Sequence, residues 1–360
     1  MKTAFRIGTI VVLAAAILSA CAPVAATPKT LTLTDALGRT VDLPGIPQRI
    51  VIAGKASGLL VNAYYLFPGS DERLVGYENR MQTSNDFIPL VSAGIANKSL
   101  LEVDAAAEQI APLKPDLVIL KTYMKEKLGD PLEQLSIPVV YLEMENPEQF
   151  TRDIRILGAV LGDPTRAEDI VKYYSDIADT ITGRTAPLDN ANRPTTLLLQ
   201  YTSKGGEVAF NIPPAAWLQT QMVEMAGGNP IWKDAGTGSG WQVVTLEQIA
   251  AWNPDQIVIV DYKGAAPMVV ADLQANSEWQ ALKAVQSGNL HAFPVDFYSW
   301  DQADPRWILG LTWLATTLQP AKFSDLDVKD SVNVFYQRMY NLSEEDVNAK
   351  VMPLLEDDLK

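Results

Sequence analysis

Several side chains that could hold a small ligand directly follow short apolar runs that predict β-strands. Four are the lysines Lys55, Lys121, Lys204 and Lys263, which could together form a positive pocket for an anion, although each one alone suits an ordinary solvated position. Aromatic side chains at similar places suit a flat or chelated organic ligand, and a tyrosine could bind ferric iron as a phenolate, but such rings also simply pack together. We predict as ligand-binding residues Lys55, Arg80, Lys121, Tyr123, Tyr201, Trp241, Tyr262, Lys263, Tyr298 and Trp300.

The sequence offers little for catalysis or for a resident metal. His291 is the only histidine, and its place inside an apolar run predicts a packed, hydrogen-bonded side chain. One histidine and one cysteine do not make a His/Cys zinc cluster, and neither a G-x-S-x-G elbow nor a Walker A loop is present. We predict no enzyme, no metal site and no intrinsic cofactor, so that a metal would enter only as part of the ligand. An exported α/β hydrolase stays open as an alternative, and it would need a nucleophile beside a base.

The first residues predict export and lipid anchoring. Lys2 and Arg6 precede a short apolar stretch (7–18), which is typical of a signal peptide. The boundary Leu-Ser-Ala-Cys resembles a bacterial lipobox, with cleavage before Cys21, the only cysteine. We therefore predict a signal peptide over residues 1–20, lipidation of Cys21, a tether over 21–29 and an extracytoplasmic, membrane-anchored protein. No disulfide can stabilise a chain with a single cysteine.

The acidic net charge of the chain limits the kinds of partner it can bind. The chain has 29 basic and 43 acidic residues and a formal net charge of −14. A field of that sign repels phosphate backbones and anionic headgroups. We predict no nucleic-acid partner, and we attribute membrane attachment to the lipid alone.

Two sets of strand-like runs flank a long helical stretch. The runs are continuously apolar, as expected for parallel strands covered on both faces. The first set lies at 49–53, 74–77, 116–120 and 139–144, and the second at 195–201, 256–261 and 290–295. Residues 147–184 predict a helix with one break at Gly-Asp-Pro (162–164). The predicted fold is therefore α/β, with two lobes (30–146 and 185–360), each a mainly parallel sheet flanked by helices, joined by one long rigid helix (147–184).

The sequence contains one short motif twice. The first copy is "EQIAPLKPDLVI", which begins at Glu108, and the second is "EQIAAWNPDQIVIV", which begins at Glu247. Both copies start with Glu-Gln-Ile-Ala and continue with Pro-Asp and an apolar run. In each copy Pro115 or Pro254 ends a helix, because proline is excluded from a helix interior, and a buried strand follows. The two glutamates should therefore occupy equivalent places in the two lobes, although Pro-Asp corners are common enough to arise independently.

The chain resembles the substrate-binding lipoproteins of ABC importers of the ferric-siderophore, haem and cobalamin type. The segment 31–54 resembles the family's N-terminal opening, the two glutamate segments match its paired motifs, "GNPIW" (228–232) matches its second-lobe helix end, and 299–323 resembles its C-terminal helix. Together these segments span nearly the whole mature chain.

The resemblance implies the function and the partners. It implies capture of a metal chelate such as a siderophore, haem or cobalamin, with an inorganic oxyanion such as molybdate as the alternative. It also implies delivery to a permease dimer with its ATPase, docking through Glu108 and Glu247, and a monomeric protein. The ligand should lie between the lobes, beyond the carboxyl ends of the strands.

Overall fold

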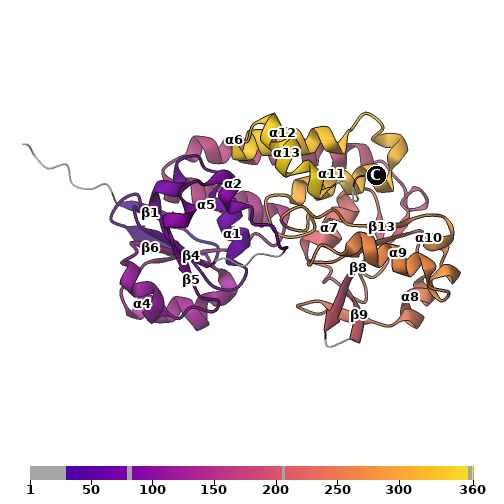
Figure 1. Ribbon diagram of the computed structural model, residues 1–360, viewed down its shortest axis with the longest axis horizontal. Coiled ribbons are helices and arrows are strands. Elements are labelled where there is room, and N and C mark those ends of the chain that lie inside the picture. Colours follow the sequence, from indigo (N-terminus) through magenta and orange to yellow (C-terminus); the bar gives the residue numbers. More distant parts are fainter. Residues whose placement is uncertain (1–29, 79–82, 205–206, 356–358, 360) are drawn as a thin grey trace, which may run out of the picture.

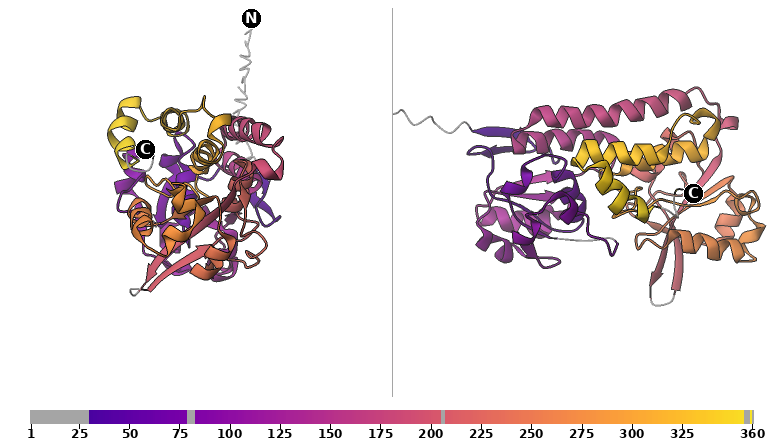
Figure 2. Two further views of the ribbon diagram at one scale, coloured as in Figure 1. Left: turned by 90° about the vertical axis from the view of Figure 1, so that its right-hand side faces the viewer. Right: turned by 45° about the horizontal axis from the view of Figure 1, so that its top comes forward.

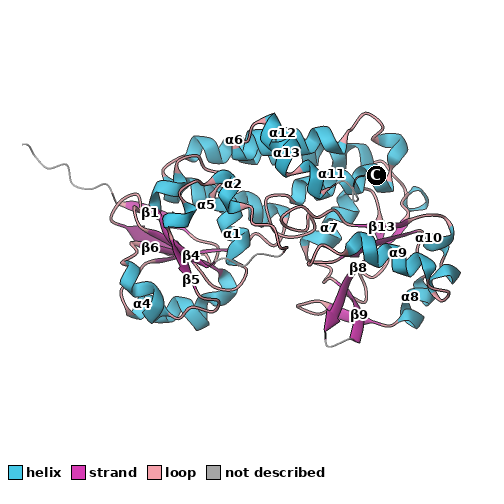
Figure 3. Ribbon diagram, in the orientation of Figure 1, coloured by secondary structure: helices cyan, strands magenta, loops and turns pink. Residues whose placement is uncertain are grey.

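The chain folds into two α/β lobes, which lie at the left and right of Figure 1. The computed structural model describes residues 30–78, 83–204, 207–355 and 359. A short antiparallel hairpin of β1 (Leu31–Thr34) and β2 (Thr40–Leu43) opens the first lobe. Helices flank the sheets of both lobes (Figure 3). The predicted fold class is confirmed.

The first lobe, called the N-lobe below, contains a five-stranded, wholly parallel sheet in the order β5-β4-β3-β6-β7. Its strands are β3 (Ile50–Ile52), β4 (Leu74–Glu78), β5 (Ser99–Leu101), β6 (Leu117–Lys121) and β7 (Val139–Leu142). Its helices are α1 (Ser57–Tyr64), α2 (Ile88–Val91), α3 (Ala107–Ile110) and α4 (Asp130–Gln134). Four of these strands were predicted; β5 was not.

Strand β3 shows why apolar runs predicted this sheet. Successive side chains of a strand point to opposite faces. Ile50 and Ile52 pack into one core cluster, and Val51 packs into a second cluster on the other face. Because helices cover both faces, every position of the strand must be apolar.

The second lobe, called the C-lobe, contains a six-stranded mixed sheet in the order β11-β9-β8-β12-β13, with β10 also paired to β8. Its strands are β8 (Thr195–Lys204), β9 (Glu207–Ile212), β10 (Asn229–Pro230), β11 (Gln242–Val244), β12 (Gln256–Val260) and β13 (Leu290–Ala292). Its helices are α7 (Leu218–Met225), α8 (Leu246–Trp252), α9 (Ala266–Ala275), α10 (Lys283–Gln286), α11 (Trp307–Leu318), α12 (Val328–Tyr340) and α13 (Glu344–Lys350).

The sequence did not predict the antiparallel part of this sheet. β8, β12 and β13 are parallel, whereas β9 pairs antiparallel with both β8 and β11. β9 and β11 carry exposed apolar residues, Val208 and Val243, and are not apolar along their whole length. They therefore lack the continuous apolar signal of a strand covered on both faces.

The link between the lobes consists of two helices, α5 (Pro147–Leu161) and α6 (Pro164–Thr185). The predicted break is present: Gly162 has a left-handed φ of 69°, and the Asp163 carboxylate caps α6 by accepting a hydrogen bond from the Arg166 backbone N–H. α6 runs along the molecule from one lobe towards the other (Figure 2). Near its start the Arg166 guanidinium donates to the Leu66 carbonyl of the N-lobe, and near its end Arg184 pairs with Asp325 of the C-lobe.

The C-terminal helices also reach the N-lobe. α12 lies beside α6 and ends close to α1 (Figure 1). The Tyr340 hydroxyl, at the last residue of α12, donates a hydrogen bond to the Asn62 carbonyl oxygen at 3.1 Å. The lobes are therefore joined by direct contacts as well as by the linking helices.

Candidate functional site

Lys55 and Tyr123 follow neighbouring strands of the N-lobe and lie beside each other. β3 pairs in parallel with β6, so the segments after these strands leave the sheet at the same edge. The Tyr123 hydroxyl donates to the Lys55 carbonyl oxygen at 3.2 Å, and both side chains are exposed. The structure therefore brings together two of the predicted ligand-binding residues.

Lys121 has a different environment. Its side chain is completely buried, and its ammonium group donates to the Glu145 carboxylate at 2.8 Å and to the Glu143 carbonyl oxygen. The Glu145 carbonyl in turn accepts a hydrogen bond from the Leu218 backbone N–H of the C-lobe at 3.2 Å. The ammonium of Lys121 thus holds the segment after β7 against the other lobe. The structure does not place it in a common positive pocket with Lys55.

Three aromatic rings form a series near the carboxyl end of β12. Trp217, at the N-cap of α7, meets Trp241 edge-on with 5.9 Å between the ring centroids. Trp241 in turn meets Tyr262, two residues beyond β12, at 6.2 Å. All three side chains are only partly buried. We call Trp217, Trp241 and Tyr262 the aromatic wall; Trp217 was missed because β9, which leads to it, was not predicted as a strand.

Asp301 anchors one end of this aromatic wall. Its buried carboxylate accepts hydrogen bonds from the Tyr262 hydroxyl (3.1 Å), the Gln219 amide (3.0 Å) and the Ser299 hydroxyl (2.6 Å). Burial, together with the charge of Asp301, raises the pKa of Tyr262 well above its usual range. Burial also raises the pKa of Asp301. Tyr262 is therefore a neutral phenol, so the alternative that a tyrosine binds iron as a phenolate finds no support at this residue.

Glu108 and Glu247 occupy the same position in the two lobes. Each is the second residue of a short helix, α3 or α8, that follows an edge strand, β5 or β11, and leads to a buried central strand. Both side chains are exposed. Hydrogen bonds from the Glu247 backbone N–H and the Thr245 hydroxyl lower the pKa of Glu247. The structural equivalence that the repeat predicted is present.

Residues 89–296, more than half of the chain, match the family described as periplasmic binding protein. The chain belongs to this family. Two curated relatives illustrate its range of ligands. This binding protein is 24% identical to the molybdate-binding protein MolA of Haemophilus influenzae over 67% of its own length and 72% of the relative's. It is 29% identical to the vitamin B12-binding protein of Pectobacterium carotovorum, over 59% of its own length and 70% of the relative's.

Solved structures show the same two-lobed fold. A periplasmic solute binding protein from Veillonella parvula superimposes with a TM-score of 0.73 at 24% identity, covering 91% of this chain and 98% of that one. The molybdate-bound MolA of H. influenzae superimposes with a TM-score of 0.71 at 20% identity, covering 87% and 98%. At these identities the similarity establishes the fold and leaves the ligand open.

The other predicted residues of this binding protein have different surroundings from one another. Tyr201 packs edge-on against Phe210 at 5.9 Å, at the base of the β8–β9 hairpin. Trp300 is fully buried, and its indole N–H donates to the Asp296 carboxylate at 3.0 Å, so it is an interior residue. Tyr298 is also buried and lines a small pocket with Asn62, at the junction of the lobes. Lys263 is exposed, and its ammonium lies 3.5 Å from the Ser203 carbonyl oxygen.

Four predictions fall outside the described residues. They are the signal peptide (1–20), the lipidated Cys21 with its tether (21–29), Arg80, and the side chain of Lys204. Among the residues that the structure describes, no helix is long and apolar enough to cross a membrane.

Within the described part of the chain, the histidine and a buried strand-end glutamate both have protein partners. His291 is packed as predicted: its Nε2 lies 2.9 Å from the Gln256 amide oxygen, and its ring meets Trp313 edge-on. Glu78, another strand-end residue, is buried, and its carboxylate accepts hydrogen bonds from the backbone N–H groups of Gly54 and Asp104. Over the described ranges, no group of three or more His, Cys, Asp or Glu side chains could hold a metal ion.

Proposed function

We propose that this protein is an extracytoplasmic solute-binding protein that captures a metal chelate and delivers it to the permease of an ABC importer. The chelate would be of the siderophore, haem or cobalamin type. The observation that carries this proposal is the aromatic wall beside the carboxyl ends of the C-lobe strands, the place where two-lobed α/β proteins bind ligands. The 29% identity to a vitamin B12-binding protein adds support.

The chemistry of the aromatic wall favours an organic surface on the ligand. Its rings are neutral and only partly buried, and aromatic surface of this kind suits a macrocycle or an aromatic chelator. Lys121, which would have been central to a pocket for a bare anion, is paired with Glu145. The positive charge available for an anion is reduced accordingly.

An inorganic oxyanion is the second candidate. The 24% identity to a molybdate-binding protein favours it, and Lys55 and Lys263 are exposed cations after β3 and β12. The two candidates use different residues, so mutagenesis can separate them.

Ligand identity can be tested directly. Metal analysis and native mass spectrometry of protein purified from its own host would identify a co-purified chelate. Tryptophan fluorescence would then follow titration with cyanocobalamin, haemin, a ferric tris-catecholate chelate and sodium molybdate.

The variants decide between the candidates. If a chelate binds the aromatic wall, Trp241→Ala should weaken its binding about tenfold or more, since a buried aromatic contact is worth roughly 1.5 kcal/mol or more with its burial included. Lys55→Ala and Lys263→Ala should have little effect on that ligand, and Lys329→Ala, an exposed lysine on α12, serves as the control. If instead the protein binds molybdate, and only the two lysine substitutions weaken that binding, the ligand is an oxyanion and the chelate proposal is wrong.

Export and anchoring complete the proposal. We propose that Cys21 carries a lipid that holds a monomeric protein to the membrane, and that the permease dimer with its ATPase is the partner. Expressed in its host, the Cys21→Ser variant should move from the membrane fraction to the soluble fraction. Retention of this variant in the membrane fraction would contradict the lipid anchor.

A further inference from the structure

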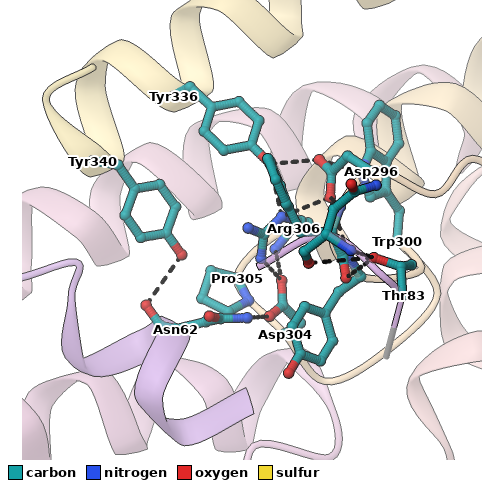
Figure 4. A network of polar contacts seen from close by, with 12 residues as sticks. Asn62, Thr83, Asp296, Trp300, Asp304, Pro305, Arg306, Tyr336 and Tyr340 are labelled. Atoms are coloured by element: carbon teal, nitrogen blue, oxygen red, sulfur yellow. Dashed lines mark hydrogen bonds and ion pairs between the residues drawn. The ribbon is translucent and has the colours of Figure 1, made fainter. Parts of the chain in front are cut away.

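A set of buried charged and aromatic residues lies where the two lobes meet (Figure 4). The loop between β13 and α11 contributes Asp296, Asp304 and Arg306, each at most 2% exposed. Charged side chains are almost never this deeply buried unless they are paired. Their partners therefore show what the loop is built to do.

Arg306 is the centre of this set. Its Nε lies 2.9 Å from an Asp296 oxygen, and its Nη1 lies 2.8 Å from an Asp304 oxygen. The Tyr336 hydroxyl of α12 accepts a hydrogen bond from Arg306 Nε at 2.7 Å and donates one to Asp296. Burial alone would lower the pKa of Arg306, but the surrounding carboxylates raise it, so the guanidinium stays charged.

Several of these contacts cross from the C-lobe to the N-lobe. The Asn62 amide of α1 donates to the second oxygen of Asp304 at 2.5 Å. The Arg306 guanidinium lies over the Phe87 ring, 4.2 Å from its centroid, and Phe87 belongs to the start of α2. Tyr340 donates to the Asn62 carbonyl and meets Phe87 edge-on at 4.7 Å. We call Asn62, Phe87, Asp304, Arg306 and Tyr340 the lobe brace.

We propose that the lobe brace holds the two lobes in one relative position in the ligand-free protein, and that the lobes separate only when it breaks. Separation would remove Asn62 from Asp304 and Phe87 from the guanidinium. Both charges would then lose a partner while Tyr336 and Asp296 still hold the Arg306 side chain inside the C-lobe. Removing one partner of a buried charge is far more costly than breaking a surface ion pair.

The lobe brace is also connected to the aromatic wall. The loop that carries Asp304 and Arg306 also carries Asp301, which anchors Tyr262 of the aromatic wall. A movement of the N-lobe is therefore transmitted to the aromatic wall through one short loop. This consequence rests on the proposed function, in which a partner that opens the lobes must break the lobe brace to release the ligand.

The experiment measures the distance between the lobes without ligand or permease. Cys21→Ser removes the native thiol from the full chain, and spin labels are placed at Leu135→Cys in the N-lobe and Met268→Cys in the C-lobe, both exposed positions. Pulsed electron paramagnetic resonance then compares the parent with Asn62→Ala and with Phe87→Leu. Asn211→Ala is the matched control, because Asn211 is a buried asparagine whose hydrogen bonds stay within the C-lobe.

The expected result is one narrow distance in the parent and in Asn211→Ala. Asn62→Ala and Phe87→Leu should add a longer distance in about a tenth of the molecules or more, a population that is detectable for a minor state. If Asn62→Ala does not fold, Phe87→Leu, which keeps an apolar side chain, decides the question. A folded brace variant with the parent's single distance would overturn the proposal and would leave the ligand experiments above untouched.

Discussion

At the scale of single residues, the environment decides what a lysine after a strand does. Lys55 follows β3 and Lys121 is the last residue of β6, and in the sequence both lysines come after an apolar run. The structure leaves Lys55 exposed, whereas it buries Lys121 against Glu145 and the Glu143 carbonyl. Lys55 is therefore accessible to a ligand, whereas Lys121 is the structural counter-ion of Glu145.

Lys121→Ala should therefore lower the free energy of unfolding. The substitution removes a buried donor of two charge-assisted or carbonyl hydrogen bonds, and each unsatisfied partner costs about 1–3 kcal/mol. The Glu145 carboxylate is partly exposed, so it can be hydrated once the lysine is gone. We therefore expect the free energy of unfolding to fall by about 2 kcal/mol, the lower end of the range for two lost partners. Urea unfolding measures it, with Lys55→Ala as the control that should unfold like the parent. Equal unfolding midpoints for the two variants would contradict the assignment of Lys121.

His291 should make stability depend on pH. Burial lowers the pKa of His291 below its ordinary value, so the unfolded chain binds the proton more readily than the folded protein does. The stabilising contribution is present above about pH 6.5, the unfolded pKa, and is lost as the pH falls below it. The chain has one histidine, so His291→Asn should flatten the decline in unfolding free energy between about pH 7.5 and 5.5. Identical slopes for parent and variant would argue against this.

At the scale of elements, helix α11 lies very close to the preceding loop, which carries Asp304 and Arg306 of the lobe brace. A Cβ atom on Gly310 would lie 2.4 Å from the Trp300 carbonyl oxygen, which is backbone and cannot move aside as a side chain would. Gly310→Ala should therefore destabilise the protein by about 1–3 kcal/mol, as overpacking does. Gly183→Ala in α6 is the matched control: that exposed helical glycine has nothing within 4 Å of a built Cβ.

The two glycine variants should change stability in opposite directions. Alanine in an exposed helix interior is favoured over glycine by up to about 1 kcal/mol, so Gly183→Ala should be neutral or stabilising. Thermal unfolding of both variants checks the pair. A Gly310→Ala protein as stable as the parent would show that α11 can shift away from the loop at little cost.

Helices α3 and α8 carry the two glutamates proposed for docking. Because Glu108 and Glu247 are exposed and lie outside the core, changing both to Ala should leave the melting temperature and ligand affinity unchanged while uptake falls. Changing both to Lys should abolish uptake if each meets a permease arginine, since like charges then oppose each other. Melting temperature, ligand affinity and uptake should be measured on the same variants. Normal uptake by the double-Lys protein would remove the docking assignment.

At the scale of the whole molecule, α6 and the lobe brace both connect the lobes. α6 spans them, and the lobe brace, which includes the contact of α12 with α1, fills their junction with buried side chains. A helical link resists large hinge motion better than flexible crossover strands do. The molecule is therefore expected to move little on binding.

Small-angle X-ray scattering with and without the bound ligand tests this expectation. The radius of gyration should change only slightly, because neither the linking helices nor the lobe brace has to rearrange. A large contraction on binding would show that the lobes are free to open, in conflict with both restraints.

The sequence by itself determined the parts whose physics is local or periodic. Continuous apolar runs located the strands β3, β6, β7, β8 and β12, because strands buried on both faces need apolar residues at every position. Gly162 and Pro164 located the break between α5 and α6, and the repeated glutamate segments located equivalent helices in the two lobes. These features follow from the conformational limits of glycine and proline and from the two periods of side-chain direction.

Only the tertiary structure decided which side chains meet. Position after a strand could not distinguish exposed Lys55 from buried Lys121, because the difference depends on Glu145 from a neighbouring strand end. Nor could it show that Trp300 lies in the interior, or that Trp217 packs against Trp241, because α7 and β10 separate these two tryptophans in the chain. The lobe brace could not be predicted either, since Asn62 and Asp304 are 242 residues apart in the chain. Contacts between distant segments depend on how lobes and loops are oriented in space, and local sequence patterns do not encode that orientation.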